Sequence, residues 1–424
     1  MLTPLEYLEK RLSGNNWILN YSMQKIYQDA YAYFQQYAYS DQIIFISTED
    51  KLDFLARFIA AASTNNTVVL AQSSSCENGS MKCSEQFSQK ILLPTGGSSG
   101  EVKFAIHTWQ TLCASVDAFT LYFDSPCVNS LCILPLFHVS GLMQAIRTLI
   151  TGGSLAIYDY KQIKQKPAQL LNFQNYFLSL VPTQLEYLLE FYPEWVGQFK
   201  TVLLGGAPAR TSLLNAARKA KIALALTYGM TETASQVVAL KPKDFLEGNN
   251  SSGKILPHSH VTIRGEDGSM LQSGEVGIVL VEANSLCLGY YPSNIEYSSP
   301  FQTDDLGYFD KNGFLYIVGR KSQKIITGGE KVYPKEVEDA IFSTFLVKDV
   351  VVVGTKDNYW GEAVVAIFVP NLGFNLEELK GLIKSTLSPH KIPKKWIQVR
   401  EIPRNQQGKI VNTQINEIIS FYVT

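Results

Sequence analysis

Pro94-Thr95-Gly96-Gly97-Ser98-Ser99-Gly100-Glu101-Val102-Lys103 is the stretch around which the rest of this sequence can be interpreted. It lies between the apolar run Ile91-Leu92-Leu93 and the segment 104–118. Glycines let backbone N–H groups close around an anion, hydroxyls add hydrogen-bond donors, and a lysine supplies positive charge. The stretch therefore predicts a phosphate-binding loop. Its candidate binding residues are Thr95, Gly97, Ser98, Ser99, Gly100 and Lys103.

The loop does not match the common nucleotide-binding patterns. No Gly-Lys-Ser/Thr follows at the spacing of a Walker loop, and no G-x-G-x-x-G is present. Taken alone, a Gly/Ser cluster is more often a plain surface loop, because this composition is common in loops. Its assignment to phosphate binding therefore depends on the motifs further along the chain.

Length and composition describe a globular protein with more than one domain. The chain has 424 residues, of which 46% are hydrophobic and 18% charged, and this excludes disorder as the main state. A net charge of −1 gives no electrostatic case for nucleic acid or an anionic membrane as the main partner. The six cysteines form no C-x-x-C pair, so neither a zinc site nor a disulfide framework is indicated.

The sequence also predicts a cytoplasmic protein without a membrane span. Residues 1–6 lack the basic and apolar regions of a secretory signal. The most apolar stretch, 131–150, is interrupted by Pro135, His138 and Arg147 and is a poor candidate for crossing a bilayer.

Alternating strands and helices are predicted in the middle of the chain. Residues 1–63 have helical spacing, and 67–71 is a short buried strand. The alternation that follows predicts a layered α/β domain with a largely parallel sheet. Ligands collect at the carboxyl ends of such strands, where Gly205-Gly206-Ala207-Pro208 and Tyr228-Gly229-Met230-Thr231-Glu232 lie. The predicted strands are 131–134, 176–181, 201–204 and 223–227, and the predicted helices include 183–191 and 210–220.

Two later changes of pattern divide the chain. Strand-like patterns with Gly/Asp turns, including the hairpin signal Asp310-Lys311-Asn312-Gly313, predict a small β-rich subdomain. After Gly319, strand-like runs at 349–354 and 363–369 and a helix capped by Asn375 predict a separate α+β domain. We therefore expect an N-terminal domain at 1–319, with its β-rich part at about 255–319, and a C-terminal domain at 320–424.

Further motifs follow the loop in a fixed order. They are Leu134-Pro135-Leu136-Phe137-His138, the segment 228–232, Thr303-Asp304-Asp305, Gly319-Arg320, Gly328-Gly329 and Gly408-Lys409. With the loop, this set resembles the adenylate-forming superfamily of acyl-CoA synthetases, adenylation domains and luciferases, from about residue 91 onward. The resemblance implies an α/β fold in which a large layered domain with a small β-rich subdomain is followed by a mobile, small α+β domain.

A narrower similarity lies in Phe137-His138-Val139-Ser140-Gly141 and in 230–236, which are most similar to the o-succinylbenzoate–CoA ligases of menaquinone and phylloquinone biosynthesis. The resemblance implies an acid–thiol ligase: a carboxylate attacks the α-phosphorus of ATP, pyrophosphate leaves, and coenzyme A captures the acyl-adenylate. Positioning and charge neutralisation dominate such a barrier. The implied cofactors are ATP, Mg²⁺ and coenzyme A. The sequence does not decide between a monomer and a homo-oligomer.

The matching positions carry implied roles. Glu232 would ligate Mg²⁺ and Thr231 would contact the α-phosphate. Lys409 would bridge the α-phosphate and the substrate carboxylate, and would withdraw when the small domain rotates about Ser322. The β- and γ-phosphates would be bound by Thr95, Ser98, Ser99 and Lys103, and the ribose by Asp305 and Arg320. The adenine slot would be lined by Gly205, Gly206, Ala207, Tyr228 and Gly229, and the pantetheine tunnel by Gly328 and Gly329. The acid would be bordered by His138, Ser140 and Arg147.

Each candidate also has an ordinary interpretation. Taken alone, His138 would be a packed histidine, Asp304-Asp305 a solvated turn and Lys409 a surface lysine. Arg147 is a partner for a second carboxylate of the acid or, equally, an arginine on a helix surface. The alternatives for the whole protein are another aryl- or acyl-CoA ligase, an adenylation enzyme that loads a carrier protein, and an inactive nucleotide-binding relative. The last has no need of a mobile lysine such as Lys409.

The sequence departs from the superfamily pattern in several places. The loop commonly has Thr-Ser-Gly-Thr-Thr-Gly-x-Pro-Lys, and the region before it is shorter here than in many relatives. Asp304 stands where glycine is usual, and Ser322 and Gln323 stand where a charged hinge is common. These departures affect the expected rate and hinge behaviour rather than the reaction class. In the loop, Gly96 replaces serine, Ser98 and Ser99 replace threonines, and Val102 replaces proline.

Overall fold

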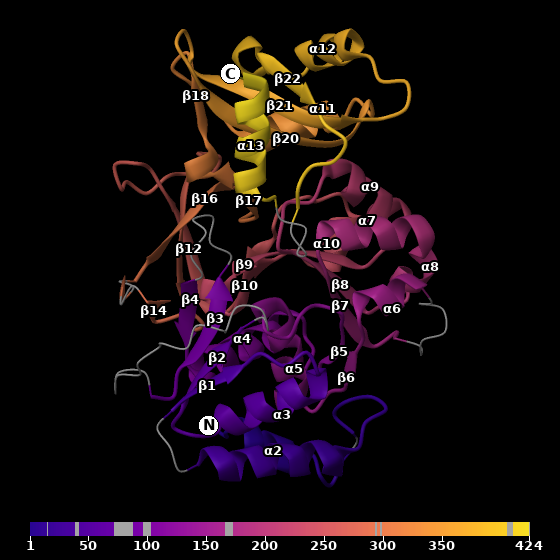
Figure 1. The fold of residues 1–424 in the computed structure, drawn as a ribbon, viewed down its shortest axis with the longest axis vertical. Coiled ribbons are helices and arrows are strands. Elements are labelled where there is room, and N and C mark those ends of the chain that lie inside the picture. The colour runs from indigo at the N-terminus through magenta and orange to yellow at the C-terminus, as the bar shows by residue number, and fades with distance from the viewer. Residues whose placement is uncertain are drawn as a thin grey trace.

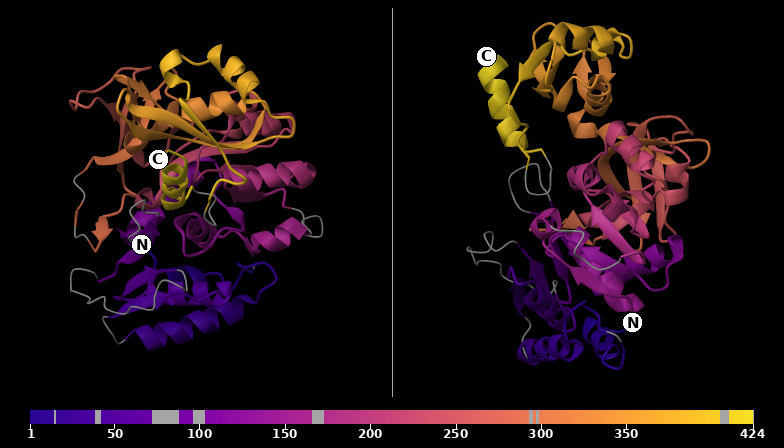
Figure 2. Two further views of the ribbon diagram at one scale, coloured as in Figure 1. Left: turned by 45° about the horizontal axis from the view of Figure 1, so that its top comes forward. Right: turned by 90° about the vertical axis from the view of Figure 1, so that its right-hand side faces the viewer.

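The structure of the chain is a computed structural model, drawn in Figure 1. The strands that it describes form four sheets. The C-terminal sheet with its helices lies at one end of the molecule, and the N-terminal helices lie at the other (Figures 1 and 2). The described residues are 1–14, 16–38, 42–71, 88–95, 103–165, 173–292, 295–296, 299–404 and 410–423.

The first sheet contains both flanks of the Gly/Ser loop. β1 to β3 are parallel, whereas β3 and β4 form an antiparallel pair in which Thr95 lies opposite Lys103. The predicted phosphate loop therefore joins the two strands of a hairpin. In spatial order the strands are β1 (Ile43–Ile46), β2 (Thr67–Leu70), β3 (Ile91–Thr95), β4 (Lys103–His107), β14 (Gly289–Tyr291) and β15 (Ile295–Glu296).

The prediction of helices throughout residues 1–63 is wrong at one place. Helices α1 (Pro4–Glu9), α2 (Met23–Tyr37) and α3 (Lys51–Ala61) form as expected. Between them, Ile43–Ile46 is strand β1, paired with β2 in the register Ile43 to Thr67. Four β-branched or aromatic residues in a row favour a strand once a neighbouring strand is present to pair with them.

The second sheet confirms the predicted, largely parallel arrangement. From β9 to β6 all pairs are parallel, and β10 and β11 add an antiparallel edge. In spatial order the strands are β11 (Lys254–Ile255), β10 (Ser235–Ala239), β9 (Leu224–Met230), β8 (Thr201–Leu204), β7 (Tyr176–Leu180), β5 (Asn129–Cys132) and β6 (Leu155–Ile157). The helices between these strands are α5 (Val139–Thr151), α6 (Tyr160–Gln165), α7 (Pro182–Phe191), α8 (Pro193–Gly197), α9 (Thr211–Lys219) and α10 (Pro242–Leu246).

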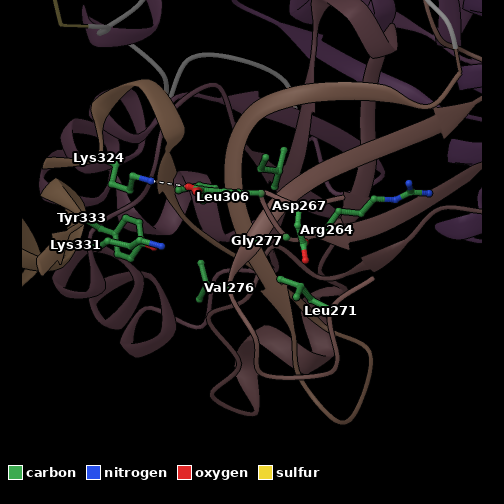
Figure 3. Close-up of a pocket in the computed structure, with 12 residues that line it drawn as sticks. Arg264, Asp267, Leu271, Val276, Gly277, Leu306, Lys324, Lys331 and Tyr333 are labelled. Atoms are coloured by element: carbon green, nitrogen blue, oxygen red, sulfur yellow. Dashed lines mark hydrogen bonds and ion pairs between the residues drawn. The ribbon is translucent and has the colours of Figure 1, made fainter. Parts of the chain in front are cut away.

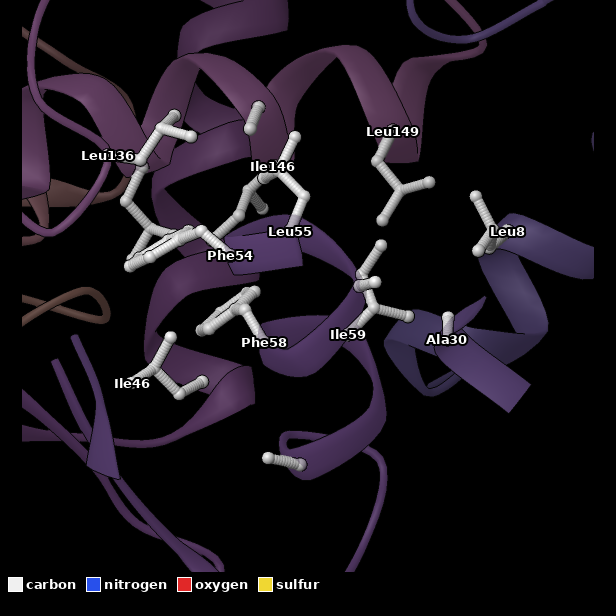
Figure 4. Close-up of a cluster of buried hydrophobic side chains, with 14 of the residues drawn as sticks. Leu8, Ala30, Ile46, Phe54, Leu55, Phe58, Ile59, Leu136, Ile146 and Leu149 are labelled. Carbon is white, nitrogen blue, oxygen red and sulfur yellow. The ribbon is translucent and has the colours of Figure 1, made fainter. Parts of the chain in front are cut away.

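Helix α4 (Trp109–Tyr122) and helix α5 join the first sheet to the second. On α4, Leu112 belongs to the same apolar cluster as Leu93 of the first sheet, whereas Phe119 belongs to a cluster with Phe177 and Leu203 of the second. The apolar face of α5 packs on α3, where Ile146 and Leu149 face Leu55 and Ile59 (Figure 4). Burial of these large side chains, each stabilising by roughly 2 kcal/mol, fixes the helix that carries the predicted acid-binding residues.

The remaining strands form two further sheets. The β-rich sheet has the order β12 (Ser259–Arg264), β13 (Gly277–Ala283), β16 (Phe301–Phe309) and β17 (Leu315–Arg320). The predicted hairpin at 310–313 is confirmed, with Asp310 N–H donating to Phe314 O at 2.9 Å. The C-terminal sheet consists of β19 (Glu330–Val332), β18 (Ile325–Thr327), β21 (Gly361–Pro370), β20 (Val347–Asp357) and β22 (Lys395–Gln398), with helices α11 (Pro334–Phe342), α12 (Leu376–Lys384) and α13 (Asn412–Val423).

The C-terminal sheet has its own cores. One cluster, which includes Ile325 and Phe368, lies under α11 and α12, and another, which includes Val351 and Ile415, lies under α13. The predicted cap is confirmed, because the Asn375 side chain accepts from two backbone N–H groups of α12. The domain boundary at 319 and 320 stays a prediction. Among the helices of the described ranges, none is long and apolar enough to cross a bilayer.

Candidate active site

A tight turn at the end of β9 carries the predicted metal ligand. Thr231–Thr233 form one turn of 3₁₀ helix, after which β10 runs back antiparallel to β9. The return requires unusual backbone, since Ala234 has φ +49° and Ser235 has φ +114°. Residues other than glycine hold such angles only where the surroundings enforce them. Thr231 and Glu232 are therefore presented by a constrained turn.

The loop hairpin lies beside this turn. Strands β3 and β4 both contact Thr231–Thr233, and Thr95 pairs with Lys103 at the end of this hairpin that leads into the loop. The hairpin that carries these two predicted phosphate-binding positions thus lies next to the turn that carries the predicted metal ligand. Other candidates, namely Gly97, Ser98, Ser99, Gly100 and Lys409, lie outside the described residues.

His107, at the end of β4, holds the turn directly, and the sequence did not suggest it as a site residue. Its Nε2 lies 2.8 Å from Thr231 O, and its Nδ1 lies 3.0 Å from Thr111 Oγ1. The ring is completely buried, and burial lowers the pKa of His107 to about 4. The imidazole is therefore neutral at neutral pH, and its Nε2–H donates to the carbonyl of Thr231.

We expect acid to destabilise the protein through His107. Its pKa in the folded state, about 4, lies below the ordinary histidine value, so the unfolded state binds the proton first and stability falls as pH falls below about 6.5. Between about pH 7 and pH 5 the loss is roughly 2 kcal/mol from this residue. Urea denaturation of wild type and His107→Gln at both pH values measures it. An equal pH dependence in the two proteins would contradict this account.

Three predicted nucleotide-binding residues meet at the carboxyl end of β9. The Tyr228 hydroxyl donates to Asp305 Oδ2 at 2.9 Å, and Arg320 Nε lies 3.5 Å from Asp305 Oδ1. Asp305 and Arg320 are direct partners in the β16–β17 register. Burial raises the pKa of Asp305, against the opposing effect of Arg320. The structure therefore brings the predicted ribose and adenine residues together.

Two glycines after β8 allow the chain to pass close to the neighbouring strand β9. Gly205 and Gly206 follow β8, next to β9, and a Cβ at Gly205 would lie 2.5 Å from Thr227 Oγ1. Gly206 has φ +80°, which favours glycine. Ala207 follows directly. The predicted adenine-slot residues therefore share one end of two adjacent parallel strands with Tyr228.

The predicted acid-binding residues lie along α5. His138 is half-buried at the N-cap, and Ser140 is exposed in the first turn. Arg147 is only 3% exposed, so the alternative of a helix-surface arginine is wrong. Its Nη2 donates to Ser235 Oγ at 2.8 Å and to Gln236 Oε1 at 3.0 Å, and both residues follow the turn that carries the predicted metal ligand.

The surroundings of Arg147 contain buried polar atoms that need partners. Within the described ranges, Gln144 Oε1, Arg147 Nε and Gln236 Nε2 have none. The guanidinium also lies 4.3 Å from the centre of the Phe119 ring, and burial lowers the pKa of Arg147 to about 9. Unsatisfied buried polar groups are costly, and a polar ligand or water beside α5 and β10 would supply the missing partners.

Arg210 is one residue that links the C-terminal part to the rest of the chain. Arg210, which precedes α9, donates to Asp349 Oδ1 of β20 at 2.8 Å, and Arg404 binds the same carboxylate at 3.1 Å. Arg210 also stacks on Phe342 of α11. Because Arg404 lies shortly before Lys409 in the sequence, this triad anchors the segment that leads to the predicted catalytic lysine.

Gly328 and Gly329 lie apart from these residues. They form the tip of the β18–β19 hairpin, with φ of +57° and +83°. That hairpin belongs to the C-terminal sheet, away from β4 and β9 (Figure 1). The predicted pantetheine contact is thus not assembled in this arrangement, and its dependence on domain rotation stays a prediction.

Two family models match the chain. The model for AMP-binding enzymes matches residues 58–291, and the model for the C-terminal domain of AMP-binding enzymes matches residues 336–409. The chain belongs to the AMP-binding enzyme family. The first match contains Thr95, Arg147 and Glu232, and the second contains Lys409.

Curated relatives of this AMP-binding enzyme cover most of its length. The 2-succinylbenzoate–CoA ligase of Listeria monocytogenes is 35% identical over 334 residues, which are 77% of this chain and 69% of that protein. The enzyme of the same name from Bacillus subtilis is 31% identical over 336 residues, which are 77% of this chain and 68% of that protein. The family that the sequence motifs predicted is therefore confirmed.

Solved structures share the fold of this AMP-binding enzyme. The o-succinylbenzoate CoA synthetase of Bacillus subtilis in complex with its acyl-adenylate intermediate matches with a TM-score of 0.81 at 23% identity, covering 96% of this chain and 97% of that chain. ATP-bound MatB from Rhodopseudomonas palustris matches with a TM-score of 0.83 at 20% identity, covering 98% of both. These likenesses confirm the predicted fold class.

The region between the two family matches contains the departures at the predicted hinge. Ser322 N–H donates to Asp304 Oδ1 at 3.0 Å, and the Ser322 hydroxyl donates to Asp304 Oδ2. The aspartate that stands in place of glycine thus binds the serine that stands in place of a charged hinge residue. The two departures form one contact in this AMP-binding enzyme.

A separate cavity lies between the β-rich sheet and the β18–β19 hairpin (Figure 3). Its volume is about 360 Å³, and it is lined by Arg264, Leu306, Lys331 and Tyr333 among others. Lys324 Nζ pairs with Glu266 Oε1 across it at 2.8 Å. None of the described site residues named above lines it, so the cavity is distinct from the candidate active site.

Proposed function

We propose that this AMP-binding enzyme is an ATP-dependent acid–thiol ligase. It adenylates o-succinylbenzoate, transfers the acyl group to coenzyme A, and releases AMP and pyrophosphate, for menaquinone or phylloquinone biosynthesis. The observation that carries the proposal is the assembly at the end of β9, where Tyr228, Asp305 and Arg320 meet beside the turn with Thr231 and Glu232. Relatives named 2-succinylbenzoate–CoA ligase, at 31% to 35% identity, support the choice of acid.

Glu232 fits a magnesium ion that arrives with ATP. Mg²⁺ prefers hard oxygen ligands and commonly takes one or two carboxylates together with substrate phosphates and water. Among the described residues, no three His, Cys, Asp or Glu side chains gather into a metal-binding group, so substrate phosphates and water would supply most of the ligands beside Glu232. Bound there, Mg²⁺ would neutralise charge on the phosphates.

The chain's own groups then hold the reactants. Thr95 and Lys103 bind the terminal phosphates, Thr231 contacts the α-phosphate, and Lys409 neutralises charge between the α-phosphate and the attacking carboxylate. His138 and Ser140, at the N-terminus of α5, border the acid. Positioned charges of this kind lower the barrier because they need no reorganisation during the reaction.

Arg147 is the proposed partner for the second carboxylate of the acid, directly or through water. Its buried cluster with Gln144, Ser235 and Gln236 lies behind the turn that presents Glu232. A site built to bind a polar group rejects ligands that lack it, because its own polar atoms are then left unpaired.

For Arg147→Met we expect kcat/KM for o-succinylbenzoate to fall about a hundredfold. The loss for 3-benzoylpropionate, which lacks the ring carboxylate, should be far smaller. Steady-state AMP release with the two acids measures the selectivity, and Arg147→Lys is the conservative variant, expected to recover part of it. Equal losses for both acids would assign Arg147 to folding alone.

The proposed activity is tested by ATP–pyrophosphate exchange. We expect exchange that requires the acid and Mg²⁺, followed by thioester formation when coenzyme A is added. An adenylating enzyme that loads a carrier protein would exchange pyrophosphate without forming the CoA thioester, and an inactive relative would bind ATP without exchange. A cytoplasmic site of action, where ATP and coenzyme A are available, is part of the proposal.

A further inference from the structure

Each backbone carbonyl group of the turn Thr231–Thr233 accepts a hydrogen bond from a residue outside the turn. Thr231 O accepts from His107 Nε2 at 2.8 Å, Glu232 O accepts from Cys287 N at 2.8 Å, and Thr233 O accepts from Ser285 Oγ at 2.9 Å. The three bonds fix the backbone on either side of the glutamate. The two residues that follow, Ala234 and Ser235, have positive φ angles, and their carbonyl groups accept hydrogen bonds from Ser115 Oγ and Thr233 Oγ1. Such strain persists only where the surroundings enforce it.

Two of these donors belong to one segment, residues 285–290, which ends in β14. Leu288 N–H donates to Ile106 O at 2.8 Å, and Tyr290 pairs with Ala105 of β4. The segment therefore lies between the turn and the strand that begins at Lys103. At its end, the hydroxyl of the half-buried Tyr290 donates to Glu232 Oε1 at 2.5 Å.

We propose that Tyr290 is a positioning residue that orients the carboxylate of Glu232 for the metal–nucleotide complex. This rests on the proposed function, in which Glu232 receives Mg²⁺. A glutamate side chain loses rotational freedom when it binds a cation, and a bond that orients it beforehand reduces that cost. A carboxylate has several acceptor positions, so a donor at Oε1 leaves capacity for the cation. Partners of metal-binding side chains commonly tune affinity in this way.

The same segment sets the spacing between the metal ligand and the phosphate ligands. Tyr290 is attached to β4 through the backbone pair with Ala105 and to Glu232 through its hydroxyl. Lys103 begins β4. The pairing of β4 with β14 thus fixes the position of Lys103, which ends the predicted phosphate loop, relative to the carboxylate of Glu232. In the proposed function, Glu232 and the phosphate-binding residues would hold the metal–nucleotide complex together, so a small change in this spacing would weaken Mg²⁺ binding.

The test is Tyr290→Phe, which removes only the hydroxyl. Binding of α,β-methylene-ATP, which cannot release pyrophosphate, is followed by calorimetry across a Mg²⁺ titration. We expect the Mg²⁺ concentration that gives half-maximal enhancement of binding to rise about tenfold. Binding of the analogue in EDTA should change by less than about twofold, since the nucleotide contacts remain. Tyr308→Phe, on a tyrosine stacked with Tyr316, is the matched control and should behave as wild type.

A second comparison separates orientation from folding. In a Glu232→Gln background, which has no charged ligand to orient, adding Tyr290→Phe should change the Mg²⁺ requirement no further. An unchanged Mg²⁺ requirement in Tyr290→Phe, or losses that add fully in the double variant, would overturn the proposal. If wild type itself bound the analogue without any response to Mg²⁺, the proposed function would fail first. Thermal unfolding of each variant identifies loss of folded protein.

Discussion

Lys409→Ala is expected to reduce adenylation at least about a hundredfold, because a positioned charge on the reacting groups contributes two to three orders of magnitude to such steps. Thioester formation from supplied o-succinylbenzoyl-adenylate and coenzyme A should stay within about threefold of wild type, since the lysine has withdrawn by then. ATP–pyrophosphate exchange measures the first step, and the thioester product measures the second.

Lys311→Ala, in the exposed β16–β17 turn, is the matched control and should leave both steps unchanged. Equal losses of both steps in Lys409→Ala would contradict a two-step reaction with a moving domain. Loss of neither step would remove Lys409 from the catalytic residues.

Gly229→Ala is expected to have the largest effect on stability among single substitutions at the site. A Cβ at this position would lie 2.1 Å from Ser235 O and 2.6 Å from Gln236 Cα, which are backbone atoms of the adjacent strand. Strands β9 and β10 would have to separate where the turn with Glu232 begins. We expect the free energy of unfolding to fall by about 3 kcal/mol, at the upper end of ordinary overpacking.

Urea denaturation measures the change. Gly381→Ala is the control: Gly381 lies inside α12, and no atom lies within 4 Å of an added Cβ. Alanine there should stabilise the helix by roughly 0.5 to 1 kcal/mol. A Gly229→Ala protein as stable as wild type would show that β9 and β10 tolerate a wider spacing.

Local sequence patterns predict many of the helices and strands correctly. Apolar runs located β7 and β8 within a residue of their bounds, and the Asn375 cap located the start of α12. Strand β1 was missed because its four residues form a strand through pairing with β2, which a local pattern does not report. The first sheet as a whole depends on pairs between distant segments, such as β4 with β14.

The candidate site was predicted as residue types and only partly as contacts. The motifs identified Tyr228, Asp305 and Glu232, because their order along the chain is distinctive. His107 and Tyr290 were missed, since each acts through a partner more than fifty positions away, Thr231 and Glu232 respectively. The sequence left Arg147 open between a helix surface and the acid site. Its burial excludes the helix surface, and its role toward the acid stays a prediction.

The proposed reaction is tested by an assay that identifies its products. Purified protein is incubated with Mg-ATP, coenzyme A and a panel of aryl and dicarboxylic acids that includes o-succinylbenzoate, and the products are identified by mass spectrometry. We predict o-succinylbenzoyl-CoA and AMP well above the products of every other acid. A thioester formed preferentially with another acid, AMP without any CoA thioester, or no turnover at all would contradict the assignment.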